Sequence, residues 1–297
     1  MTKVGIKLLA ILVIFSACNK DDDKEEDNNT SSGEPELIFK VKVDGNQERL
    51  DNTGQPSTIP DGHAAQTPDF NLISAHYIEL TPNAFVQVGD GAVVYHAPET
   101  DAGGNTAIDF SKSKLVKDGE IMFKLPLSEV DPGIYEFARV SVAYQNYDVD
   151  FRANDMDFKA TLASFVGYNT YIESHKVNEL EDEVNGNKLQ GYWAWETHPN
   201  QFMQNPIMET GQAPGVTVPN PLSGSSPIPA GSCLVTGEFD EKLTISGEET
   251  SDVVVEISFS INNSFEWEDI NENGKFEPLD DEKVVDMGLR GLKARKL

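Results

Sequence analysis

Hydrophobic and polar residues alternate along much of the chain, with the period expected of β-strands that bury one face. The clearest case is Leu37 to Val43, where apolar residues occupy every second position and Lys40 and Lys42 stand between them. No apolar stripe of helical period extends beyond about two turns. Further strands are expected at 77–80, 85–88, 92–96, 121–125, 135–144, 160–166, 168–173, 189–196, 233–239, 242–245 and 253–260.

Turn-forming pairs separate these runs. Asp44-Gly45 predicts a hairpin directly after the first strand, and Asp90-Gly91 and Asn185-Gly186 fall between later ones. Many short strands with turn signals are typical of a sandwich or barrel. We therefore predict an all-β, antiparallel β-sandwich, formed by residues 37–297 as one domain. A long Pro-rich loop interrupts it from Asn205 to Ser232, and loops of this length are often functional.

The N-terminus has the composition of an export signal. Lys3 and Lys7 precede an apolar run from Leu8 to Phe15, which ends in the small residues Ser16 and Ala17. This run is shorter than the ~20 residues that a membrane-spanning helix needs. Residues 1–17 are therefore predicted to be a signal peptide for the general secretory pathway.

The segment Phe15-Ser16-Ala17-Cys18 resembles the lipobox of bacterial lipoproteins, although Leu is usual where Phe15 stands. The resemblance implies that Cys18 carries the lipid that anchors the protein to a membrane. The alternative is an ordinary signal peptide with an incidental cysteine.

Residues 18–36 form a predicted disordered acidic tether, because like charges repel and no apolar face exists. Its run Asp21-Asp22-Asp23 resembles the surface-export signal of Bacteroidota lipoproteins, which implies the cell-surface side of the outer membrane. The alternative is a spacer for a periplasmic domain.

Charge and cysteine content narrow the possible functions. The chain has 50 acidic against 23 basic residues and a formal net charge of −27, which argues against nucleic-acid binding. If Cys18 carries lipid, Cys233 has no partner, so no disulfide is expected. We expect Cys233 to be a small buried residue. A nucleophilic role would require a nearby His.

The stretch from Asp269 to Asp280 has the spacing of an EF-hand-like calcium loop. Gly274 at position 6 permits the left-handed turn, and the carbonyl of Lys275 stands at position 7. The expected side-chain ligands are Asp269, Asn271, Asn273, Glu277 and Asp280. Position 12 is Asp rather than the usual Glu, and no helical pattern follows. The alternative is an acidic turn that binds no ion.

A second unusual segment surrounds two tryptophans. Strand alternation places Trp193 and Trp195 on one face. They are either a buried pair or an aromatic platform for a sugar or peptide. His198 with the thioether of Met203 or Met208 is a candidate soft-metal site. The remaining histidines, His63, His76, His96 and His175, show no zinc-ligand spacing and are expected to be structural.

Four short motifs resemble the methanobactin-associated copper-binding protein family. They are Asp131 to Tyr135, Phe165 to Ile172, Tyr192 to His198 and the β run from Val253. The resemblance implies a β-sandwich that binds copper in the bacterial envelope, with His198 as the one aligned histidine. A Trp-rich segment of the family is replaced here by Ala163-Ser164-Phe165.

Three functions follow from these observations. The first is a non-catalytic surface lipoprotein, stabilised by Ca²⁺, that binds an extracellular ligand or an envelope partner. The second is a copper-binding envelope lipoprotein. The third is a carbohydrate-active enzyme that uses two carboxylates across a cleft, although the abundance of Asp and Glu prevents any pair from being nominated.

Overall fold

The computed structural model describes residues 33–51, 53–213 and 231–297, and Glu34–Leu297 form one compact unit. The signal peptide, Cys18, most of the tether and the middle of the Pro-rich loop lie outside the described residues, so the expectations placed on them stay predictions. The described residues form strands and three short 3-10 turns, which confirms the all-β, sandwich-like fold. None of them forms a helix with the length and apolarity needed to cross a bilayer.

The strands of the first half are β1 (Glu36–Asp44), β2 (His63–Gln66), β3 (Asp69–Thr81), β4 (Ala92–His96), β5 (Glu99–Thr100), β6 (Ala107–Asp109), β7 (Ile121–Pro126), β8 (Gly133–Ala153) and β9 (Met156–Phe165). Those of the second half are β10 (Asn169–Lys176), β11 (Glu181–Leu189), β12 (Tyr192–Thr197), β13 (Met208–Gln212), β14 (Cys233–Ile245), β15 (Val253–Ser260), β16 (Phe265–Glu268), β17 (Val284–Met287) and β18 (Leu292–Lys296). The 3-10 turns are η1 (Phe110–Lys112), η2 (Leu127–Glu129) and η3 (Pro278–Asp280).

The strands form one large sheet and two small ones. The large sheet has the order β13-β12-β9-β8-β14-β18-β15-β1-β7, and β3 pairs with both β8 and β4. The small sheets have the orders β11-β10-β6-β5 and β17-β16-β2. Most pairings are antiparallel, as expected, but β1–β15, β6–β10 and β14–β18 are parallel.

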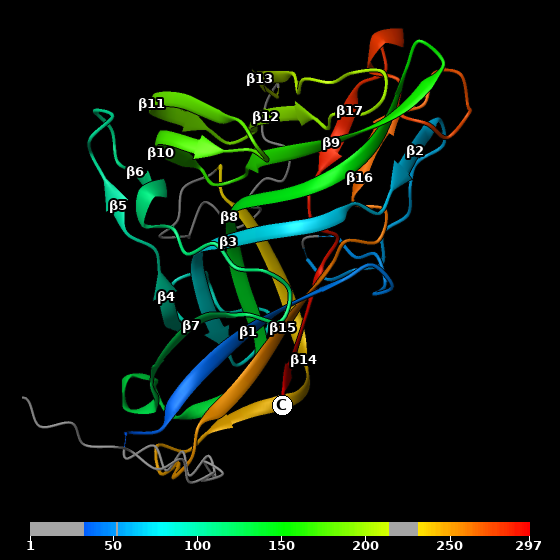
Figure 1. Ribbon diagram of the computed structural model, residues 1–297. Coiled ribbons are helices and arrows are strands. Elements are labelled where there is room, and N and C mark those ends of the chain that lie inside the picture. Colours follow the sequence, from blue (N-terminus) through cyan, green and yellow to red (C-terminus); the bar gives the residue numbers. More distant parts are fainter. Residues whose placement is uncertain (1–32, 52, 214–230) are drawn as a thin grey trace, which may run out of the picture. The chain divides into compact units, whose positions relative to one another are not determined.

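Strand β8 spans 21 residues and connects two regions of the large sheet. Its first half, Gly133 to Val142, pairs with β14, and its second half, Tyr144 to Ala153, pairs with β9. Strand β3 pairs along the middle of β8. Figure 1 shows β8 in green, beside β3 and leading to β9.

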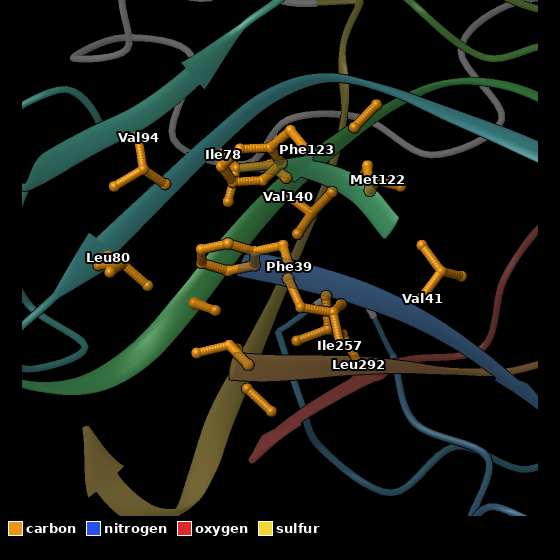
Figure 2. Packing of buried hydrophobic residues seen from close by; sticks show 14 of the residues in the cluster. Phe39, Val41, Ile78, Leu80, Val94, Met122, Phe123, Val140, Ile257 and Leu292 are labelled. Carbon is orange, nitrogen blue, oxygen red and sulfur yellow. The ribbon is translucent and has the colours of Figure 1, made fainter. Parts of the chain in front are cut away.

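The largest hydrophobic core lies among the strands around the first half of β8. Alternation in β1 buries Leu37, Phe39, Val41 and Val43, as the sequence pattern predicts. Figure 2 shows Phe39 beside Phe123, whose rings stack with centroids 4.5 Å apart. Burying one such side chain contributes roughly 1.5–3 kcal/mol to folding.

Two smaller cores lie at the second half of β8. Tyr144, Phe165 and Tyr192 pack on one face of the strands β8, β9 and β12. Tyr147, Leu162, Phe265, Trp267 and Phe276 pack on the other. This second face therefore joins β8 and β9 to the small β16–β17 sheet and to residues 269–282, which we name the acidic loop.

Several local predictions were wrong. Asn185-Gly186, expected to separate two strands, lies within β11, and strand β13 lies inside the expected Pro-rich loop. Strand β1 does not form a hairpin at Asp44-Gly45, because it pairs with β15 and β7 from distant parts of the chain.

The expected strand at 85–88 is a loop. Its backbone and that of the next residues form hydrogen bonds with Arg139 and Glu79, which are a buried ion pair. Arg139 donates to the carbonyl of Val86, and Glu79 accepts from the N–H groups of Gly89 and Gly91. These side chains satisfy the polar backbone groups that a strand would pair in a sheet.

Candidate functional site

Strands β3, β4 and β5 bring together two histidines and a glutamate. His76 lies within β3 at an irregularity in its pairing with β8, between Ala75 and Tyr77. His96 ends β4 and lies opposite Tyr77, and Glu99 begins β5. Bulges of this kind redirect side chains and are common beside functional sites.

The three side chains converge on one point. The Nε2 atom of His76 lies 3.0 Å from Oε1 of Glu99, and Nε2 of His96 lies 3.9 Å from the same oxygen. One ligand atom from each residue lies within 4.8 Å of the others. The hydroxyl of Tyr168, just before β10, donates to Glu99 Oε1 at 2.9 Å. We name His76, His96, Glu99 and Tyr168 the histidine cluster.

Burial controls the charge of His76. The side chain is fully buried, and its pKa is lowered to about 4, first by desolvation and then by the nearby His96, despite the hydrogen bond to Glu99. The imidazole is therefore neutral at neutral pH. Its Nδ1 atom is buried with no hydrogen-bond partner in the described part of the chain. A buried polar atom without a hydrogen-bond partner lowers the stability of the folded state.

A backbone carbonyl orients the ring of His96, the second histidine of the cluster. His96 Nδ1 lies 3.1 Å from the carbonyl oxygen of Ala97, an arrangement in which Nδ1 carries the hydrogen and Nε2 is left as a lone-pair donor. Burial, with the hydrogen bond to Glu99, raises the pKa of Tyr168 above its usual value, so this hydroxyl stays protonated.

The acidic loop follows β16 and is folded by its own side chains. Asp269 accepts from the backbone N–H groups of Asn273 and Gly274, at 3.1 and 2.8 Å. Asn271 accepts from the N–H of Asn273, and Asn273 accepts from the N–H of Lys275. Gly274 has a φ of +71°, the left-handed conformation that the sequence predicts for it.

The acidic side chain that closes this loop is Glu282, which the sequence reasoning did not identify. Its carboxylate accepts from the N–H groups of Ile270 and Glu277, at 3.2 and 2.7 Å. The side chain is buried, and its pKa is raised by desolvation and by the charges of Asp269 and Glu277. Asp280 is exposed, and its side chain has no hydrogen bond or ion pair within the described residues.

Glu277 lies at the centre of the loop. Its Oε2 accepts from the side-chain amides of Asn271 and Asn273, at 2.6 and 2.7 Å. Its Oε1 lies 3.3 Å from Nε of Arg152. The carboxylates of the loop do not converge as closely as the ligand atoms of the histidine cluster.

The predicted aromatic segment lines a hollow. Trp193 and Trp195 are half-buried on one face of β12, while Tyr192, Ala194 and Glu196 are buried on the other, which confirms the predicted alternation. Trp195 packs edge-on against Phe151, with ring centroids 5.1 Å apart.

The predicted soft-metal residues are held by separate partners. His198 Nε2 is 2.8 Å from the hydroxyl of Thr161, and the sulfur of Met203 accepts from Thr197. Met203 lines the hollow beside Trp195, whereas Met208 packs on the opposite core around Tyr144.

Cys233 is free and buried, as expected. Burial raises the pKa of its thiol to about 12, and the charge of Asp286 acts in the same direction. The reactive thiolate is therefore not populated at neutral pH.

Comparisons of the chain with protein-family models, with curated proteins and with solved structures find no match.

Proposed function

We propose that this protein binds a divalent transition-metal ion at His76, His96 and Glu99. The observation that supports the proposal best is the convergence of three ligand atoms from three strands within 4.8 Å.

The distances suit such an ion. Zinc-ligand bonds are about 2.0–2.2 Å long, so two tetrahedral ligand atoms lie roughly 3.4 Å apart. The separations of 3.0 and 3.9 Å at Glu99 bracket this value, and the ligand atoms of the two histidines lie within 4.8 Å of each other, so movements of the side chains would complete the geometry.

We propose zinc or copper as the ion, because two imidazoles and one carboxylate suit both metals, with copper bound more tightly in general. The copper that the family resemblance implies is compatible with this set, although at residues other than His198. A His96 side chain that is 46% exposed gives the ion a route from solvent.

We further propose that the site belongs to an exported lipoprotein. The signal-like residues 1–17 and the lipobox-like position of Cys18 support a lipid anchor, and the acidic tether supports the surface of the outer membrane. The proposal is a binding function, with an extracellular ion as the ligand, and includes no catalytic step.

Calcium is the second ion that we propose, as a structural clamp in the acidic loop. The charges of Asp269 and Glu277 are close enough to Glu282 to raise its pKa. Arg152 is the cation paired with Glu277. A divalent cation would relieve this repulsion. Glu282 takes the closing role that spacing alone gives to Asp280.

Metal titration by calorimetry tests the transition-metal site. We expect saturable binding of Zn²⁺ and Cu²⁺, weakened by more than about 100-fold in His96→Ala, because loss of a ligand should exceed the effect of an outer-sphere change. His198→Ala is the matched control and should bind as the wild type does. The opposite pattern would move the site to the segment around His198, and a wild-type protein that binds neither ion would overturn the proposal.

A further inference from the structure

Two adjoining hollows lie at the end of the β8–β9 hairpin, away from the strands that carry the histidine cluster. The first has a volume of about 670 Å³ and the second about 630 Å³. Phe151, Phe158 and Phe276 line both. Small-molecule sites have volumes of roughly 300–1,000 Å³, so each hollow is large enough for a ligand.

The first hollow is apolar. Trp193, Trp195, Leu162, Phe265 and Met287 form much of its wall. Two further lining residues, Ile207 and Leu279, remain 53% and 66% exposed. Exposed apolar side chains gathered at an open hollow mark a binding surface, because a ligand that covers them removes apolar area from water.

The second hollow has a mixed lining with an excess of cations. Three cations, Arg152, Lys159 and Lys275, line it with two carboxylates, Asp150 and Asp157, in a chain where acidic residues outnumber basic ones about two to one. These cations are paired with carboxylates that are mostly solvent-exposed, including Asp157 at 65% and Asp69 at 75%. Exposed ion pairs contribute little to stability, so the cations can exchange these partners for a ligand anion.

We propose that the two hollows together bind an anionic amphiphile with one long apolar chain, such as a long-chain carboxylate. The chain lies in the first hollow, and the head group reaches Lys159 and Lys275 in the second. This site shares no residue with the histidine cluster, whereas Lys275, Leu279 and Glu282 of the acidic loop line the hollows.

The wall chemistry selects this ligand class. A sugar is bound through aromatic faces with many hydrogen bonds, whereas the first hollow adds the aliphatic Leu162, Ile207, Leu279 and Met287. A purely apolar ligand would leave the cations of the second hollow without a role. An amphiphile satisfies both hollows at once.

The three tryptophans of the chain provide the readout, because Trp193 and Trp195 line the first hollow and Trp267 lines the second. The probe is 12-bromododecanoate below its micellar concentration, whose bromine quenches indole fluorescence by contact. With the full chain we expect saturable quenching that unbrominated dodecanoate reverses. The uncharged 12-bromododecanol should bind at least about tenfold more weakly.

Variants at the mouth and at the head-group site separate the contributions. Leu279→Glu and Ile207→Glu put a charge at the apolar mouth and should each weaken binding by about tenfold or more. Leu189→Glu on β11 is the control, since Leu189 is equally exposed and lies outside both hollows. The double variant Lys159→Ala, Lys275→Ala should remove the preference for the acid over the alcohol.

Three results would overturn the proposal: no saturable quenching in the wild type, mouth variants that bind as Leu189→Glu does, or equal binding of the acid and the alcohol by the wild type. His96→Ala should leave quenching unchanged, so failure of the metal site and failure of this site are distinguishable.

Discussion

The acidic loop and the histidine cluster are two candidate cation sites that are built in opposite ways. The loop takes all its acidic and amide side chains from one stretch, 269–282, and the hydrogen bonds of these side chains run within that stretch. The histidine cluster takes its residues from three separate stretches, with His76 in one, His96 and Glu99 in the next and Tyr168 in the third, and depends on strand register. A local site leaves a spacing in the sequence, whereas a site assembled by the fold does not.

The difference extends to how each site fails. The loop is attached to the core through buried Phe276, which holds its position whether or not an ion is bound. In the histidine cluster, the position of His76 follows from an irregularity in β3, and any change of register would separate it from His96. We therefore expect ion binding to stabilise the loop and strand register to control the cluster.

The largest effect is expected at Glu99, which contacts every other member of the histidine cluster. Glu99→Gln should weaken Zn²⁺ and Cu²⁺ binding by more than about 100-fold, because a neutral amide replaces the charged ligand. Calorimetric titration measures the change. Glu136→Gln on β8 is a control outside the cluster, and an equal loss in both variants would show that the effect is nonspecific.

Calcium should stabilise the folded state through the loop. At a free Ca²⁺ concentration one hundred times the dissociation constant, the free energy of unfolding should rise by ~2.7 kcal/mol. Thermal melting with Ca²⁺ and with chelator measures this. Asp269→Ala and Glu282→Gln should abolish the response.

Two controls sharpen the calcium prediction. Lys275→Ala should keep the response, since Lys275 offers only its carbonyl. Asp280→Ala should also keep most of it, because the Asp280 side chain is exposed. A response lost in Asp280→Ala and kept in Glu282→Gln would restore the assignment made from spacing, and a wild type that melts alike in both conditions would leave a simple acidic turn.

A smaller effect is expected at Tyr168, which reaches the cluster through Glu99. Tyr168→Phe removes one hydrogen bond to the carboxylate and should weaken metal binding by about 10- to 100-fold, as outer-sphere changes do. The melting temperature of the metal-free protein should change little. Wild-type affinity in Tyr168→Phe would restrict the cluster to its three ligands.

The smallest effect concerns pH. The folded state holds the Glu282 proton more tightly than the unfolded chain, because its pKa is raised. Stability in chelator should therefore fall as pH rises from the ordinary value of 4.5 through the folded pKa. Calcium should reduce this fall.

Denaturant unfolding between about pH 4 and 7 measures the pH dependence, with Glu282→Gln as the reference. The reference is needed because Asp286, with a pKa raised to about 6, acts in the same direction. His76 acts oppositely, since its lowered pKa makes stability fall on acidification. Parallel curves for wild type and Glu282→Gln would show that Glu282 does not contribute to the pH dependence of stability.

Much of the fold could be predicted from the sequence because its strands bury alternate residues. The run from Val253 to Ser260 is a strand with those bounds, and Leu37 to Val43 lies within β1. Strand β11 was missed because Glu181 to Leu189 is rich in charged and amide residues, as an edge strand tolerates. The strand that pairs with β11 could not be predicted either, because register and pairing are properties of the assembled sheet.

The candidate sites divide in the same way. The turn at Gly274 and the ligand order around Asp269 could be predicted, since they depend on neighbours in sequence. Glu282 could not, because η3 intervenes and the residue lies beyond the standard loop. Glu99 follows His96 by three residues, yet neither carries a signal until β3 places His76 beside them.

The pairing of β1 sets an order of events in time. The N–H of Glu36 donates to the carboxylate of Asp252, 216 residues along the chain, and β1 then runs beside β15. A chain synthesised from its N-terminus can pair β1 with β7 early, but the other edge of β1 stays unpaired until almost the whole protein has emerged. Contacts this distant slow folding and leave an apolar strand exposed to aggregation. A nascent chain that stops before Val253 lacks both β15 and β18, so the sheet around β1 closes only at the end of synthesis.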